Sequence, residues 1–258
     1  MKKAALLLVA FTFIATALSA KDFYQIKIYH LKDAGQEQTV ESYLEKAYLP
    51  ALHRAGISKA GVFKNIKTES FDDAKEERLI YVFVPFKSAA DMLKLEQKLD
   101  KDKIYLNAGA DYLNAAHNKT PYDRIETTLL SAFDGSPKFN LSPLTGPKSK
   151  RVYELRSYEG PTEKLYKSKL KMFNAGGEIA LFTRLGFNAV FYGDVVSGSR
   201  MPNLMYMTTF ENKASRDKHW DAFRDDSEWK KLSGMEEYKN TVSKSTITFL
   251  YPADYSDI

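Results

Sequence analysis

Charged and phenolic side chains alternate in a short segment that opens the second half of the chain. Glu154, Arg156 and Tyr158 are separated by single residues within residues 151–158, whose composition favours a β-strand. Because side chains alternate in a strand, all three lie on the same face. A guanidinium can bind an anion, a carboxylate can orient it or accept a proton, and a phenol can donate a hydrogen bond. These residues are therefore candidates for binding a small polar or anionic ligand.

A similar segment opens the first half and supplies a second set of candidates. Gln25, Lys27 and Tyr29 alternate there in the same way. We expect both sets to face the interior of one barrel, while Tyr153 and Leu155 face the covering helices. Burying charges is costly unless they are paired. The six polar residues are thus predicted to form either a ligand cleft or a set of contacts that fixes the register of the two halves.

Motifs for metal, nucleophilic or nucleotide chemistry are missing from the sequence. The four histidines (His30, His53, His117 and His219) show none of the spacings of zinc sites, and the chain has no Cys. No GxSxG motif and no glycine-rich phosphate loop is present. The catalytic residues therefore stay unknown, and we predict no metal site and no cofactor.

Length and composition fit a globular chain of two modules. The chain has 258 residues, of which 44% are hydrophobic, and its 38 Lys and Arg against 33 Asp and Glu give a net charge of +5. This bias is too weak to indicate nucleic acid binding, and no nucleic acid-binding motif supports it. The sequence predicts a small-molecule ligand as partner and no nucleic acid.

Residues 1–20 have the pattern of a secretory signal peptide. Lys2 and Lys3 precede an apolar run of about fifteen residues, and small residues lead to a cleavage site after Ala20. The run is shorter than the ~20 residues of a membrane span, although an anchor is the alternative. We expect a periplasmic or secreted protein without stable membrane insertion after cleavage. The absence of Cys excludes disulfides and lipid attachment at that site.

Two copies of the order βαββαβ follow, as in ferredoxin-like folds. The first half is predicted to contain strands at 23–30, 57–67, 78–86 and 122–133, with helices at 39–53, 88–99 and 104–116. The second half repeats this order with strands at 151–158, 186–193, 204–210 and 242–251, and helices at 162–185 and 213–223. The predicted organisation is a signal peptide at 1–20, a first module at 21–133, a linker at 134–149, a second module at 150–252 and a tail at 253–258.

Over residues 150–252 the chain resembles the NIPSNAP family. The matching motifs are Val152–Tyr158, Leu185–Phe187, Met205–Arg216, Trp220 and Ser227–Trp229. The first half is similar to a diverged copy, with Gln25 and Lys27 where Glu154 and Arg156 stand in the second.

The resemblance implies an α+β fold in which two tandem ferredoxin-like modules pack as a dimeric α+β barrel. Pairing of the modules within one chain would complete the barrel, and a homodimer of such chains stays an alternative. The family's role is undefined, so we expect a small ligand or partner bound in or near the barrel. Related barrels include cofactor-free monooxygenases and haem-handling enzymes. A cofactor-free oxygenase or isomerase, or a haem enzyme, is therefore the alternative.

Overall fold

The structure is a computed structural model that describes residues 21–65 and 77–258. The predicted signal peptide lies outside these residues, and so do residues 70–76 of the segment 70–77, for which the sequence predicts a charged loop before the third strand. Within the described residues, no helix is long and apolar enough to cross a membrane.

In the described part of the chain, eight strands close into one antiparallel barrel. Their order around the barrel is β1-β3-β2-β8-β5-β7-β6-β4. The strands are β1 (Phe23–Leu31), β2 (Gly61–Lys64), β3 (Arg78–Phe86), β4 (Arg124–Ala132), β5 (Val152–Glu159), β6 (Asn188–Ser197), β7 (Asn203–Phe210) and β8 (Lys244–Pro252). Each half contributes four neighbouring strands in the ferredoxin-like order. The predicted fold, two tandem modules forming one dimeric α+β barrel, is confirmed.

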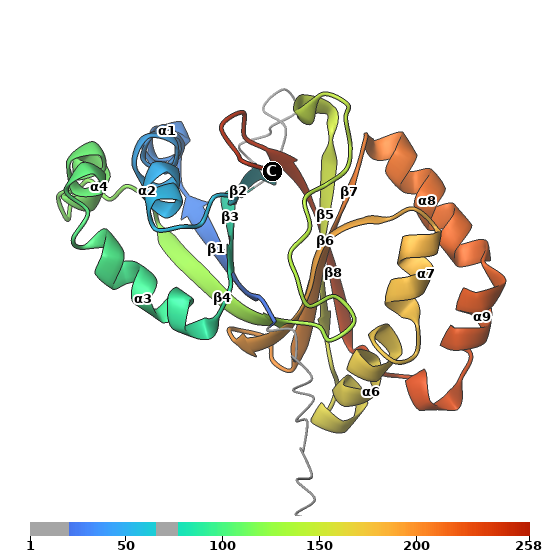
Figure 1. Cartoon of the computed structure of the whole chain (residues 1–258). Helices are drawn as coiled ribbons and strands as arrows, with labels where there is room; N and C mark the ends of the chain where they lie inside the picture. Colours follow the sequence, from blue (N-terminus) through green and yellow to red (C-terminus); the bar gives the residue numbers. More distant parts are fainter. Residues whose placement is uncertain (1–20, 66–76) are drawn as a thin grey trace, which may run out of the picture.

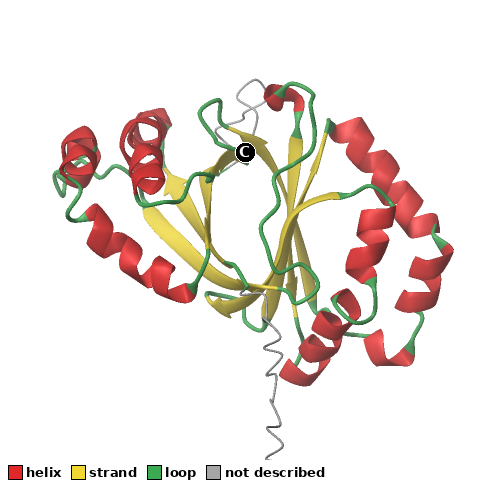
Figure 2. Cartoon of the chain, in the orientation of Figure 1, coloured by secondary structure: helices red, strands yellow, loops and turns green. Residues whose placement is uncertain are grey.

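Helices cover the barrel on two opposite sides, one side for each half (Figures 1 and 2). In the first half these are α1 (Ala34–Tyr43), α2 (Leu49–Arg54), α3 (Ala89–Leu99), α4 (Lys103–Ala108) and α5 (Ala110–Leu113). In the second half they are α6 (Glu163–Phe173), α7 (Glu178–Arg184), α8 (Lys213–Asp225) and α9 (Ser227–Ser233). The helical stretch predicted at 162–185, which the Gly176-Gly177 pair is expected to break or bend, is two helices, because Gly177 adopts φ +93° before α7.

Pro50 falls within the first helical segment of the chain, where the sequence predicts a kink or an early end. The chain instead forms a π-helical turn, Leu44–Tyr48, between α1 and α2. Pro50 lies at the start of α2, where its missing N–H costs least. The wider turn therefore lets the helical segment continue past the proline.

The barrel interior is filled by apolar side chains from both halves. Phe83 illustrates this packing, since its ring stacks on Phe191 with 4.9 Å between centroids and lies 5.4 Å from Tyr24. Further buried members of this cluster are Ile26, Phe63, Leu130, Tyr153, Leu155, Met207 and Leu250. The two halves therefore share one core, separate from the helix-facing core of each half.

The linker between the halves lies across one end of the barrel, where it crosses the middle of the view in Figure 1. The N–H of Asp22 donates to the carbonyl of Pro137, and the N–H of Phe139 donates to the Asp22 carboxylate at 2.9 Å. The Phe139 ring lies 5.6 Å from that of Phe83. The linker is thus attached to the first strand and packs against the shared core.

Phe83→Ala should lower the free energy of unfolding by about 3–5 kcal/mol, because it leaves a cavity between the two halves. Urea denaturation followed by circular dichroism measures this change. Leu93→Ala on α3 is the control, because Leu93 is 74% exposed and its loss should matter by no more than about 0.5 kcal/mol. Equal effects of the two changes would contradict a shared aromatic core.

Candidate functional site

The six predicted site residues do not line the barrel interior, so the predicted placement is wrong. Tyr153 and Leu155 point into the barrel with Tyr24 and Ile26. Glu154, Arg156 and Tyr158 lie on the opposite face of β5, under the helices of the second half, as their contacts below show. Gln25, Lys27 and Tyr29 lie on the corresponding face of β1, where Tyr29 joins the first half's helix-facing core.

The reason for this inversion is that both faces of β1 and β5 are covered. Alternation shows which residues share a face, but it does not show whether that face meets helices or the opposite sheet. The interior is closed and apolar and offers no partner for a charge. The helix side does offer such partners, because α8 carries hydrogen-bond donors that reach β5. Charged residues therefore belong on the helix side, where the cost of burial is offset by pairing.

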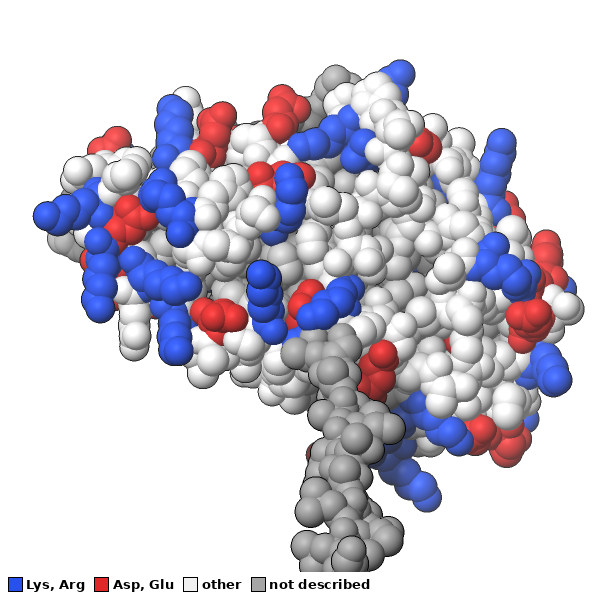
Figure 3. Space-filling model, in the orientation of Figure 1, with Lys and Arg blue, Asp and Glu red and all other residues white. Residues whose placement is uncertain are grey.

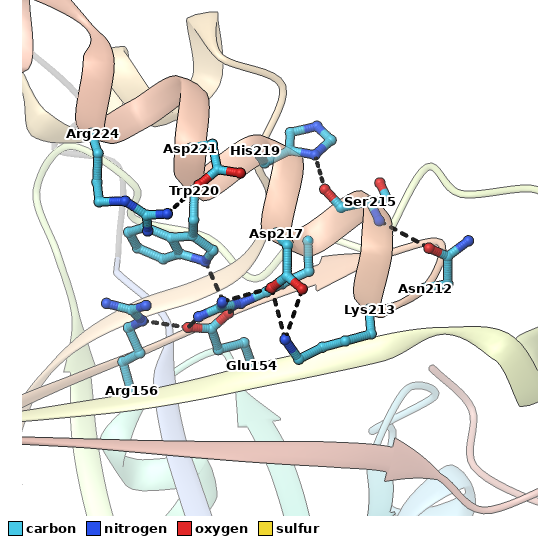
Figure 4. Close-up of polar contacts among 11 residues, drawn as sticks. Glu154, Arg156, Asn212, Lys213, Ser215, Asp217, His219, Trp220, Asp221 and Arg224 are labelled. Carbon is cyan, nitrogen blue, oxygen red and sulfur yellow. Dashed lines mark hydrogen bonds and ion pairs between the residues drawn. The ribbon is translucent and has the colours of Figure 1, made fainter.

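Glu154 is fully buried (0% exposed) and is the centre of this helix-side network (Figure 4). Arg216 on α8 binds its carboxylate with two N–H groups, at 2.5 and 2.9 Å. Trp220, one turn further along α8, donates its indole N–H at 2.9 Å, and Arg156 donates at 2.5 Å. Both carboxylate oxygens thus accept two donors each, and no lone pair remains for a ligand.

The network continues along β5 from Arg156 to Tyr158 and then to Tyr206 on β7. The guanidinium of Arg156 stacks on the Trp220 ring at 3.6 Å and donates to the Tyr158 hydroxyl at 2.9 Å. The hydroxyls of Tyr158 and Tyr206 are 2.9 Å apart. The contacts of Arg156 with Glu154 and Tyr158 lie within β5, whereas the others join β5 to α8 or to β7. We therefore interpret Glu154, Arg156 and Tyr158 as a polar lock between β5 and α8.

Burial by itself would raise the pKa of Glu154. Hydrogen bonds from Arg216 and Arg156 and their positive charges outweigh this effect, so the pKa of Glu154 is lowered. The carboxylate is therefore held in its charged form, as a structural anion requires, and is poorly suited to act as a base.

The matching positions of the first half make weaker contacts. The Lys27 ammonium lies 3.7 Å from the Glu96 carboxylate and 5.4 Å from the centre of the Tyr48 ring. Tyr29 packs edge-on against Tyr112 and Tyr122. The structure thus brings together three of the six predicted residues on each side of the barrel, and the two groups lie in separate helix–sheet layers.

A pocket of about 250 Å³ opens at the barrel end where β1 finishes, and residues from both halves line it. We call it the mouth pocket. Its apolar base includes Leu79, Leu155 and Met205. The polar groups around it are His30, Glu77, Tyr81, Arg124, Glu126, Thr128, Ser157, Arg200, Asn203, Thr246 and Thr248. Convergent polar groups over an apolar base are typical of ligand sites.

His30 lies almost fully buried at the wall of the mouth pocket. Its Nε2 is 3.2 Å from the Glu126 carboxylate, and its Nδ1 contacts the Glu77 carboxylate. Both carboxylates also lie near Arg124, whose Nη2 is 3.8 Å from Glu77 and 3.2 Å from Glu126. Consistent with this geometry, no group of three or more His, Asp or Glu among residues 21–65 and 77–258 could hold a metal ion.

Tyr81 and Arg200 complete the chemistry of the pocket. Burial raises the pKa of the Tyr81 phenol to about 12, so it is a neutral hydrogen-bond donor at physiological pH. Arg200 lies in the loop before β7 with φ +68°, a conformation that non-glycine residues seldom adopt. No residue in the described ranges forms an ion pair with Arg200. Its guanidinium is therefore a cation available to a ligand.

Sequence reasoning missed the mouth pocket, although one signal was present. His30 follows Ile26 and Ile28 at the two-residue period of a strand, so it continues the barrel-facing side of β1. Nothing in the sequence places Arg200 beside it, because that proximity arises when the two halves close the barrel.

Comparison with known proteins supports the fold and part of the family resemblance. The family model described as NIPSNAP matches residues 153–257, so the second half of the chain corresponds to a NIPSNAP domain. No curated protein sequence matches the chain.

Solved structures match nearly the whole chain. A candidate monooxygenase from Fusobacterium nucleatum shares 8% identity, covers 90% of this chain and 93% of its own length, and gives a TM-score of 0.58. A candidate monooxygenase from Lactobacillus acidophilus shares 10% identity with coverages of 90% and 94% and a TM-score of 0.54. An anthrone oxidase-like protein shares 12% identity with coverages of 92% and 93% and a TM-score of 0.52. At such identities these matches show the fold alone.

Glu154→Gln tests the polar lock, because it keeps the side chain's shape and removes the charge shared by Arg156 and Arg216. The free energy of unfolding should fall by about 3–5 kcal/mol, since two buried cations lose their partner. Asp217→Asn is the control, because Asp217 also binds Arg216, at 2.9 Å, but is half exposed. Its loss should cost about 1 kcal/mol or less by the same urea titration.

Comparison of the wild type with Glu154→Gln also tests the charge state of Glu154. Its lowered pKa means that the unfolded chain binds more protons in acid, so the lock contributes fully above the ordinary value of 4.5. The contribution must decrease as the pH falls below that value. The stability difference between wild type and Glu154→Gln should therefore shrink toward about pH 3. A difference that is constant over this range would show that Glu154 is not the ionised partner.

Proposed function

We propose that the protein binds a small polar ligand in the mouth pocket, in particular a hydroxylated carboxylic acid such as a sugar acid. The observation that supports this function most is the combination of the available Arg200 cation with a ring of neutral hydroxyl and amide groups. Glu77 and Glu126 are engaged by His30 and Arg124, so they compete little for Arg200. A carboxylate would bind Arg200, and ligand hydroxyls would bind Ser157, Asn203 and the threonines.

The size and position of the pocket support the same class of ligand. A volume of about 250 Å³ suits a small molecule rather than a large prosthetic group. Three histidines are also engaged within the described chain, since His30 faces two carboxylates, His53 binds Asp257 and His219 binds the carbonyl of Ser215. These contacts speak against haem bound through a buried histidine.

Arg200→Gln is the direct test, because it removes the charge while a similar side chain keeps the same backbone position. D-Glucuronate and D-gluconate should raise the melting temperature of the wild type by several degrees at saturation, since they bind the folded state. This rise should be lost in Arg200→Gln, whose melting temperature without ligand should equal that of the wild type.

Two controls make the result decisive. Arg224→Gln removes an exposed arginine of α8 that does not line the pocket, and it should keep the full ligand response. D-Glucose and sorbitol lack the carboxylate and should give a much smaller rise. A rise that persists in Arg200→Gln, or no rise with either acid, would contradict the proposed ligand class.

Proton-transfer catalysis in the same pocket is the second candidate function. It is favoured by the buried imidazole of His30, whose Nδ1 is hydrogen-bonded to Glu77 while its Nε2 lies near Glu126 without a hydrogen bond, and by the neutral phenol of Tyr81 in the same pocket. The two fold neighbours described as candidate monooxygenases make oxygen consumption a second reaction to measure.

His30→Gln separates binding from catalysis. With a ligand that raises the melting temperature, the wild type should exchange a carbon-bound proton of that ligand for deuterium, as followed by NMR. His30→Gln should bind with about the same affinity and exchange at least about a hundredfold more slowly, the contribution usual for a general base. Equal exchange in both proteins would leave binding as the function.

A further inference from the structure

A second cavity, unrelated to the mouth pocket, lies where the helices of the first half meet the linker. It has a volume of about 370 Å³ and runs between α3, the end of β3 and the turn that follows α2. We call it the linker groove. Its base is formed by Phe86, Leu95 and Ile57, which belong to the helix-facing core, and by Phe139 of the linker. The groove is thus an apolar trough with one wall supplied by the segment that joins the two halves.

The rim of the linker groove carries more available positive than negative charge. Lys59 and Lys87 line it and form no ion pair with any residue in the described ranges. The third lysine, Lys98, donates to the carbonyl of Ala55 at 3.2 Å and keeps two further N–H donors. Figure 3 shows Lys and Arg side chains gathered over the helices of the first half, at the left of the view.

The two acids of the rim are already occupied. The carboxylate of Asp22 accepts from the Lys138 ammonium at 3.0 Å and from the N–H of Phe139 at 2.9 Å. Asp91 accepts from the hydroxyl of Ser88 at the start of α3. Neither acid therefore neutralises Lys59 or Lys87, and an anion could approach both lysines without displacing an internal contact.

A ligand that matches an apolar base beneath unpaired ammonium groups carries both an apolar part and a negative charge. A strongly hydrated ion such as phosphate or sulfate would bind the lysines but leave the half-buried side chains of Ile57 and Phe139 in contact with water. A neutral hydrocarbon would leave the lysines unused. We propose that the linker groove binds an aliphatic monocarboxylate, with its chain against Ile57 and Phe139 and its carboxylate at Lys59 and Lys87.

This site is independent of the mouth pocket in residues and in ligand. The mouth pocket carries hydroxyl and amide groups above its apolar base, whereas the linker groove carries lysines above an aromatic and aliphatic base. The two cavities share no lining residue. Variants of Lys87 and of Arg200 therefore report on different sites, and the failure of one proposal leaves the other standing.

Calorimetric titration of the whole protein with hexanoate, octanoate and decanoate tests the proposal. Affinity should rise by roughly fourfold for each added methylene group until the groove is filled, because each buries its surface against the base. The alcohols of the same chain lengths should bind roughly tenfold more weakly, since they lack the charge that the lysines attract.

Charge reversal locates the site. The double variant Lys59→Glu/Lys87→Glu should weaken octanoate binding by about tenfold or more, because attraction becomes repulsion. Lys94→Glu is the control, since it reverses the charge of a lysine on α3 that does not line the groove. It should alter the affinity by less than about twofold, and Arg200→Gln should not alter it.

Three results would overturn the proposal. The first is the absence of saturable octanoate binding to the wild type at millimolar concentration. The second is unchanged binding in the Lys59→Glu/Lys87→Glu variant while its melting temperature stays that of the wild type. The third is loss of octanoate binding in Arg200→Gln, which would assign the carboxylate to the mouth pocket instead.

Discussion

The central strands of each half, β1, β3, β5 and β7, are largely covered on both faces, and this constraint determines where their polar residues can lie. One face meets the opposite sheet and the other meets helices, so neither is solvated. The interior contains stacked rings such as Phe83 and Phe191 and has no partners for charges. The charged residues of β1 and β5 accordingly lie in the helix layers or at the open barrel end, where water and opposite charges are available.

The helix layer of the second half shows how a buried charge is made tolerable. Glu154 loses its hydration completely, and four donors from Arg156, Arg216 and Trp220 replace it. Because all of its lone pairs accept hydrogen bonds, this carboxylate fixes the position of α8 on β5 and is not available to react with a ligand. The corresponding layer of the first half relies on packed tyrosines such as Tyr43 and Tyr112, whose rings stack at 3.7 Å. The two halves thus share a topology but stabilise it by different chemistry.

The sequence predicts the elements of this protein better than its sites. The third strand, residues 78–86, and the start of α3 at Ser88 agree with the structure, because apolar runs and cap residues are local signals. The direction in which Glu154 and Lys27 point could not be predicted, because it depends on which surface covers each face of the sheet. The mouth pocket depends on closure of the barrel, which brings His30 and Arg200 together across 170 positions of sequence. Such long-range proximity has no local signature.

The linker has a consequence for the symmetry of the molecule. When two identical chains form such a barrel, a twofold axis requires every residue at the interface to fit its counterpart in both copies. Joining the halves through one polypeptide holds them at a high effective concentration and removes that requirement. Each half can then contribute different groups to a shared cavity, as the first half does with His30 and the second with Arg200. Joining the two halves in one chain therefore allows an asymmetric pocket in a fold that otherwise has approximate twofold symmetry.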